Sequence, residues 1–158
     1  MKLTILSRMA DFLQQIRLNS IDSALETLKS QRNRVSNAKT PDGSVSALML
    51  ASELTPPSKA IQLIDALVLN GASLNKRVEK RRHVILYACE AGVDPSIIDA
   101  LLKWNKSKKN VIDRWWIHCD SNFNGVFILA CSSLNFNLVE HILALASKEE
   151  AKRGENIL

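Results

Sequence analysis

Residues whose side chains could carry out chemistry are few and scattered in this chain. His118, Cys119 and Asp120 form a run of three reactive types, but adjacent side chains diverge, and a nucleophile needs its base within hydrogen-bond reach. No Cys-x-x-Cys or His-x-x-x-His pair supplies a zinc site. The five glycines do not gather into a phosphate-binding loop. We therefore predict a protein that is not an enzyme and that uses no metal and no cofactor.

Basic side chains are concentrated in two segments. Residues 76–82 carry five bases and one acid, and residues 103–114 carry the same numbers of each. Clustered Lys and Arg side chains attract carboxylates of another protein, or phosphates of a nucleic acid or a lipid surface. A loop that is merely solvated is a third interpretation of the same residues. The charge pattern alone leaves all three open.

The composition indicates which elements must carry these segments. Hydrophobic residues make up 46% of the chain and aromatic residues only 5%, which favours helices, because strands draw on aromatic and β-branched residues. Three cysteines, an odd number, argue against a disulfide framework and favour a reducing compartment. We expect an all-α protein.

The first residues predict an amphipathic helix and not a targeting segment. Ile5, Met9, Phe12 and Ile16 recur at helical spacing, and polar residues interrupt the run before a signal core could form. No apolar run approaches the ~20 residues that a membrane span needs. We therefore expect a cytoplasmic or nuclear protein without a secretory signal and without a membrane span.

Three apolar runs that end in alanine repeat along the chain. They are ALMLA at 47–51, VILYA at 84–88 and VFILA at 126–130, followed by IDALV at 64–68, IDALL at 98–102 and VEHIL at 139–143. A nearly all-apolar run suits a helix with neighbours on both sides, whereas the later runs have the period of a half-exposed helix. The pattern predicts stacked helix pairs. Cys89 and Cys131 each follow the alanine, so both are expected to be buried.

Turn residues separate the predicted helices. The two prolines at 56–57 interrupt any helix, and Ser58 is the predicted N-cap of the next one. Asp94 is expected to cap a helix that begins at Pro95. Gly71 is expected to supply the left-handed residue after a helix end.

Two stretches resemble the ankyrin repeat family. Residues 42–51, DGSVSALMLA, are similar to that family's opening turn and its Thr-Pro-Leu-His-Leu-Ala helix start. Residues 67–75, LVLNGASLN, are similar to its Leu-Leu-x-x-Gly-Ala-x-x-Asn ending. The resemblance is good over 42–75, weaker over 83–105 and weaker again over 120–146. It implies an all-α, ankyrin-like helical repeat solenoid of stacked antiparallel helix pairs.

The chain also departs from that family's pattern. The Thr-Pro pair is absent, Met49, Leu86 or Ile128 stands in place of the histidine, and the connection from Asn105 to Phe123 is longer than a standard one. A helical solenoid of another repeat type is the alternative. The expected organisation is one domain over 1–158, with a capping helix pair at 1–35, repeats at 42–75, 76–110 and 120–146, and a C-terminal extension at 147–158.

The resemblance implies protein binding by loops and first helices, which together form a concave face. Carried over position by position, that face would present Asp42, Ser44, Val45, Glu53, Lys80, Arg81, Arg82, Glu90, Asn122 and Asn124. The expected partner is another protein with an acidic surface or an acidic peptide. One alternative is binding of a nucleic acid or an anionic surface through 76–82 and 103–114. Another is a structural or oligomerisation domain of a larger protein.

Two tryptophans next to the second basic segment are further candidates. Trp115 and Trp116 follow Arg114 directly, and tryptophan is enriched at binding hot spots. We include both among the predicted partner-binding residues, with packing of the long connection against the helices as the alternative. His83 is expected to be an ordinary residue at a helix edge.

Overall fold

The structure is all-helical. It is a computed structural model that describes residues 2–31, 33–107 and 112–155, and it contains no strand within these ranges. The α-helices are α1 (Lys2–Arg17), α2 (Ile21–Gln31), α3 (Asn33–Ser36), α4 (Ala47–Ser52), α5 (Pro57–Leu69), α6 (Val84–Ala91), α7 (Pro95–Ser107), α8 (Val126–Ser132) and α9 (Phe136–Glu155), and two short 3-10 helices are η1 (Glu79–Arg81) and η2 (Trp115–Ile117). The all-α prediction is confirmed.

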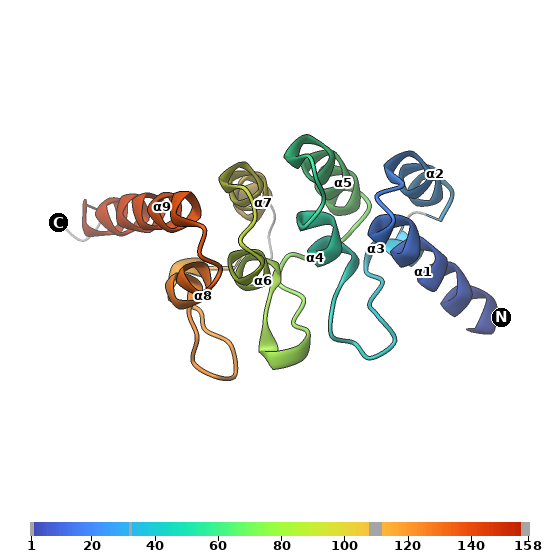
Figure 1. Ribbon diagram of the computed structural model, residues 1–158, viewed down its shortest axis with the longest axis horizontal. Coiled ribbons are helices and arrows are strands. Elements are labelled where there is room, and N and C mark those ends of the chain that lie inside the picture. The colour runs from blue at the N-terminus through green and yellow to red at the C-terminus, as the bar shows by residue number, and fades with distance from the viewer. Residues whose placement is uncertain (1, 32, 108–111, 156–158) are drawn as a thin grey trace.

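The longer elements are arranged in two rows (Figure 1). Helices α1, α4, α6 and α8 form the first row, and each contacts the next one along the chain. Helices α2, α5, α7 and α9 form the second row in the same way. Each first-row helix also contacts the second-row helix that follows it in sequence. The units are therefore helix pairs laid side by side.

The Ala-ended runs lie in the first row, in α4, α6 and α8. Ala51, Ala88 and Ala130 are all fully buried, as expected for short helices with neighbours on several sides. The second row is amphipathic; in α5, for example, Leu67 is fully buried and Leu69 is 69% exposed. Apolar burial of this kind stabilises the layers at roughly 25 cal/mol per Å² removed from water.

Cysteine burial follows position in the row. Cys89, in α6, is buried as predicted. The prediction for Cys131 is wrong, because this residue of α8 is exposed. The reason is that α6 lies between α4 and α8, whereas α8 is the last first-row helix of the described chain, so one side of it has no helix to cover it.

The turn residues act mostly as the sequence predicts. Helix α7 begins at Pro95, and the Asp94 carboxylate accepts a hydrogen bond from the Ser96 amide at 2.9 Å. Gly71 has φ +93°, in the left-handed region that favours glycine. The prediction for Ser58 is wrong, because α5 begins at Pro57 with Pro56 as its N-cap residue. Proline suits this first turn, where its missing amide donor costs nothing.

The C-terminal segment is part of a long helix. Helix α9 runs from Phe136 to Glu155 without a break, so residues 147–155 continue the last second-row helix. Residues 156–158 of the predicted extension and 108–110 of the predicted second repeat lie outside the described residues. No helix within the described ranges is long and apolar enough to cross a membrane.

Three loops project from the first row on the same side (Figure 1). Each leads into the next first-row helix. We call residues 38–46, before α4, the first finger; residues 76–83, before α6, the second finger; and residues 117–125, before α8, the third finger.

Candidate functional site

Each finger is closed at its base by main-chain pairing. The first finger closes through the Lys39–Ser46 bridge and the third through the Cys119–Gly125 bridge. In the second, the Val78 amide donates to the Arg82 carbonyl at 3.0 Å. These contacts hold the two ends of each finger together, next to the first-row helix that follows it.

The first finger is also held by its own polar side chains. The Thr40 hydroxyl donates to Asp42, and the same carboxylate accepts the Ser44 amide at 3.1 Å and the Ser44 hydroxyl at 2.8 Å. The Thr40 hydroxyl, followed by the Ser44 groups, lowers the pKa of Asp42 to about 2. Asp42 is exposed, whereas Val45 is half-buried and packs against the core. Asp42 and Ser44 thus shape the finger as well as face solvent.

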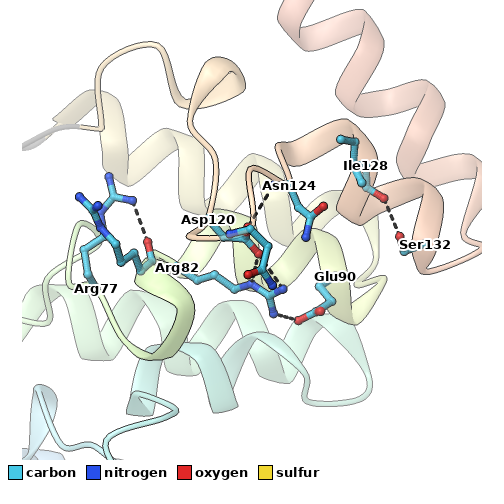
Figure 2. A network of polar contacts seen from close by, with 9 residues as sticks. Arg77, Arg82, Glu90, Asp120, Asn124, Ile128 and Ser132 are labelled. Carbon is cyan, nitrogen blue, oxygen red and sulfur yellow. Dashed lines mark hydrogen bonds and ion pairs between the residues drawn. The ribbon is translucent and has the colours of Figure 1, made fainter.

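Arg82 joins the second finger to the third (Figure 2). Its Nε and Nη2 atoms donate to Oδ2 of Asp120 at 3.1 and 2.9 Å, and its Nη1 atom donates to Glu90. Arg82 is only 7% exposed. The expectation that Arg82 lies on the open face with Lys80 and Arg81 is therefore wrong. Its guanidinium turns inward because Asp120 and Glu90 supply two carboxylates there.

Asp120 organises the third finger around this ion pair. Its Oδ1 atom accepts the amides of Asn122 at 2.8 Å and Asn124 at 3.0 Å. Burial acts to raise the pKa of Asp120, but the Asn124 amide, the Arg82 side chain and the Asn122 amide outweigh it, so the pKa lies below its usual value. Asp120 thus remains charged and fully bonded. Asn122 is exposed at the tip and Asn124 is half-buried.

Further hydrogen bonds connect neighbouring fingers. Lys39 Nζ donates to the Arg77 carbonyl at 3.2 Å, and Lys76 Nζ donates to the Asn37 carbonyl at 2.8 Å. The Ser121 amide donates to the Lys80 carbonyl at 2.8 Å. The row of fingers is therefore cross-linked along its length, which lowers the entropy that binding would otherwise have to remove.

Lys80 and Arg81 remain directed to solvent at the tip of the second finger. Both are exposed, and no hydrogen bond or ion pair from the described residues engages either side chain. Both have φ +57°, a left-handed conformation that is uncommon for residues with long side chains. Two adjacent cations are thus held outward by a backbone turn that is itself unusual.

The first-row helices contribute acids next to the fingers. Glu53, at the end of α4, is exposed, and Glu90, in α6, pairs with Arg82 and is partly exposed. Tyr87 of α6 lies close to Glu53. Burial, followed by the contact with Glu53, raises the pKa of Tyr87 above its usual range. The surface beside the fingers is thus mixed in charge.

The two tryptophans pack inside. Trp115 is 3% and Trp116 is 8% exposed, and their rings meet edge to face at 5.7 Å. The Trp116 indole N–H donates to Glu150 at 2.6 Å, and Arg153 lies over its ring. The expectation that they offer a binding surface is wrong. They hold the long connection against α9, and this packing removes their apolar area from water.

Two described residues of the second basic segment form ion pairs with α9. Lys106 pairs with Glu149 at 3.1 Å, and Asp113 of the segment pairs with Arg153 at 2.5 Å. Lys108 and Lys109 lie outside the described residues.

His118 and Asp120, the two titratable side chains on either side of Cys119, are engaged in separate contacts. His118 Nδ1 lies 3.3 Å from Nη2 of Arg77, while Asp120 turns to Arg82. Burial raises the pKa of the Cys89 thiol to about 12. Among the described residues, no group of three or more His, Cys, Asp and Glu side chains is placed to hold a metal ion.

His83 has a more specific place than its sequence indicates. It is fully buried, and its Nδ1 atom accepts the Leu86 amide at 3.4 Å as the N-cap of α6. Its Nε2 atom has no partner. The position is equivalent to Ser46, which caps α4, so alignment of the repeats could have revealed the role.

Sequence reasoning also missed Phe123 and Ile117 of the third finger. Phe123 is 83% exposed with φ +62°, and Ile117 is 57% exposed. The available signal was a lone aromatic residue in the polar loop SNFNG.

No protein-family model matches this chain, and no curated protein sequence is significantly similar to it.

Proposed function

We propose that this chain is an ankyrin-like repeat protein that binds another protein through its fingers and the adjoining first-row helices, and that it has no catalysis of its own. The observation that carries the proposal is the row of cross-linked fingers with Lys80 and Arg81 free at its centre. A rigid set of loops that presents unpaired cations is suited to recognition, because little ordering is needed on binding.

The partner surface that fits best is acidic. Lys80 and Arg81 have no counter-ion among the described residues, so a carboxylate on a partner would gain from them without first breaking a pair seen there. Glu53 lies on the neighbouring helix and favours a partner that also carries a base. Such mixed charges select orientation and raise the association rate more than they raise affinity.

The helix pairs support the ankyrin-like assignment. The units at α4–α5, α6–α7 and α8–α9 each have a projecting loop, then a short first-row helix, then a longer second-row helix, which is the order that the resemblance over 42–75 implies. Stacked units bury their apolar faces against neighbours and leave the loops available for binding.

The test is partner capture with charge reversal that leaves Arg82 intact. The full chain, its Lys80→Glu/Arg81→Glu variant and a Lys59→Glu/Lys103→Glu control are immobilised and exposed to native extract. The control carries the same charge change on exposed residues of α5 and α7. We expect proteins captured by the wild type to be lost with the finger variant and retained by the control. Equal capture by all three would contradict the proposal.

A measurement of stability accompanies the capture. Both variants should keep the helical circular dichroism and the unfolding midpoint of the wild type, because all four side chains are exposed. Loss of folding only in the finger variant would show that Lys80 and Arg81 are structural. Salt-dependent binding of a generic oligonucleotide with no protein captured would favour nucleic-acid binding instead.

A further inference from the structure

A pocket of about 390 Å³ lies between the second and third fingers. Its lining includes Arg77 and Arg81 from the second finger and Ile117, His118, Asp120 and Phe123 from the third. The second finger makes one side of the lining basic, and the third finger adds two apolar side chains, Ile117 and Phe123, next to the polar residues at 118–121. The two sides come from segments about forty residues apart that the finger contacts bring together.

The basic side of the pocket is prepared for an anion. Arg77 donates to the Arg81 carbonyl at 2.8 Å and approaches His118 Nδ1, but no carboxylate pairs with it among the described residues. Burial and the Arg77 charge lower the pKa of His118, which favours the neutral ring beside Arg77. Arg77 is thus held in place with its charge uncompensated.

The only acid in the lining does not neutralise these arginines. Asp120 uses Oδ2 for Arg82 and Oδ1 for the amides of Asn122 and Asn124. Both oxygens of Asp120 are therefore occupied by internal donors, and Arg82 shares its charge between Asp120 and Glu90. A carboxylate that entered would meet Arg77 and Arg81 as the nearest unpaired charges.

Phe123 is exposed to solvent and its backbone has an unfavourable, left-handed conformation. Phe123 is 83% exposed, and its left-handed conformation is fixed by the hydrogen bond from its amide to the Asp120 carbonyl at 3.1 Å. An L-residue in this region loses roughly 1 kcal/mol or more. At 83% exposure, the Phe123 ring buries little of its area against the described residues. Ile117 lies on the same side of the pocket and is also exposed.

We propose that this pocket binds a segment of a partner protein in which an Asp or Glu side chain lies beside a bulky apolar side chain. The carboxylate would pair with Arg77 and Arg81. A planar guanidinium can donate two parallel hydrogen bonds to one carboxylate. The apolar side chain would cover Phe123 and Ile117. The inference rests on the proposed protein-binding function and specifies the chemistry of its ligand.

The distribution of bases in the fingers favours a carboxylate over a nucleic acid. Lys39 and Lys76 donate to carbonyls of neighbouring segments, and Arg82 is paired with Glu90 and Asp120. The bases left for a ligand are thus confined to one end of the second finger. A nucleic-acid strand needs a groove of bases that follows its backbone, whereas one or two carboxylates need only this pocket.

The test is selection from a displayed library of random short peptides against the immobilised full chain. Selected peptides are then measured against Arg81→Gln, Phe123→Asn and a control that carries Lys59→Gln and Leu69→Asn, two exposed positions of α5. Asparagine tolerates a positive φ, so Phe123→Asn removes the ring without disturbing the turn. Unchanged unfolding midpoints confirm that each variant is folded.

We expect the selected peptides to share an acidic residue next to a bulky apolar one. Each pocket variant should weaken their binding roughly tenfold, as loss of one hot-spot contact does, and the control should not. Peptides that bind all variants equally, but are lost with Glu53→Gln, would overturn this pocket and leave the proposed function standing. Failure to select any peptide, with oligonucleotide binding in its place, would overturn both.

Discussion

The first finger and the junction of the second and third fingers are held by different chemistry. In the first finger, Thr40, Asp42 and Ser44 bond to one another within five residues, and Asp42 stays at the surface. At the junction, Arg82 reaches Asp120 across 38 positions of sequence, and both side chains are buried. One arrangement is local and solvated, and the other links two repeats.

This difference indicates how much of the binding surface depends on each contact. Loss of a surface hydrogen bond in the first finger affects that loop alone. Loss of Arg82 leaves the buried Asp120 without its counter-ion, and loss of Asp120 leaves the buried Arg82 with Glu90 alone. Removing one member of a buried ion pair costs far more than the net gain from making the pair. The junction therefore determines whether the pocket exists at all.

The largest effect is expected from Asp120→Ala. This change removes both the acceptor for two finger amides and one of the two carboxylates that pair with Arg82. We expect the free energy of unfolding, measured with urea, to fall by about 3 kcal/mol or more. A loss no larger than that of the matched change Asp42→Ala would remove the distinction between the two regions.

A smaller, pH-dependent effect is expected from His83→Asn. Burial, with help from Arg77 and His118, lowers the pKa of His83 to about 3. The His83 ring therefore stays unprotonated in the folded protein, whereas in the unfolded chain it takes up a proton below about pH 6.5. Wild-type stability should thus fall as pH drops from about 6.5 toward about 3, by at most about 1.4 kcal/mol per pH unit.

Asparagine does not titrate and is itself a good N-cap residue. The difference in unfolding free energy between the wild type and His83→Asn should therefore narrow or reverse with acidification. Parallel pH profiles for the two proteins would show that His83 is protonated in the folded state or is not buried.

Asp42→Ala should have a weaker effect that is confined to the first finger. The pKa of Asp42 is lowered to about 2 by Thr40 and Ser44, so its contribution is present above about pH 4 and is lost as pH falls through about 2. We expect faster amide hydrogen exchange at Ser44 and Val45 and no change at Ser121 or Asn124. Faster exchange in the third finger as well would mean that the first finger is coupled to it.

The smallest effect on stability is expected from Lys80→Glu/Arg81→Glu. Both side chains are exposed and form no ion pair within the described ranges. Surface substitutions of this kind usually change stability by about 0.5 kcal/mol or less. Thermal unfolding followed by circular dichroism gives the measurement. A loss comparable to that of Asp120→Ala would mean that the tip of the second finger is not free.

The helix pairs were accessible from sequence because their signal is local. The Ala-ended runs and the spaced apolar residues after them report burial through periodicity, so α4, α6 and α8 could be predicted one by one. Gly71 and Pro95 could be assigned to their turns for the same reason. The ankyrin-like arrangement remains a proposal.

The candidate site could be predicted only in part because burial of a charge depends on distant partners. Five bases in 76–82 look alike in sequence, and only the position of Asp120 selects Arg82 as the inward one. The sequence left Trp115 and Trp116 open between binding and packing, and the contacts of Trp116 with Glu150 and Arg153 of α9 favour packing. Phe123 was missed because its exposure follows from the turn conformation and not from its neighbours.

The most direct test of the account is a double-mutant cycle of Arg82→Met and Asp120→Ala, with the Arg81→Met and Asp120→Ala cycle as its control. Urea unfolding of all the variants gives the two coupling energies. We predict about 2 kcal/mol or more for Arg82 with Asp120, and additivity within about 0.5 kcal/mol for Arg81 with Asp120. Additive losses in the first cycle would contradict the inward pairing of Arg82 and the junction built on it.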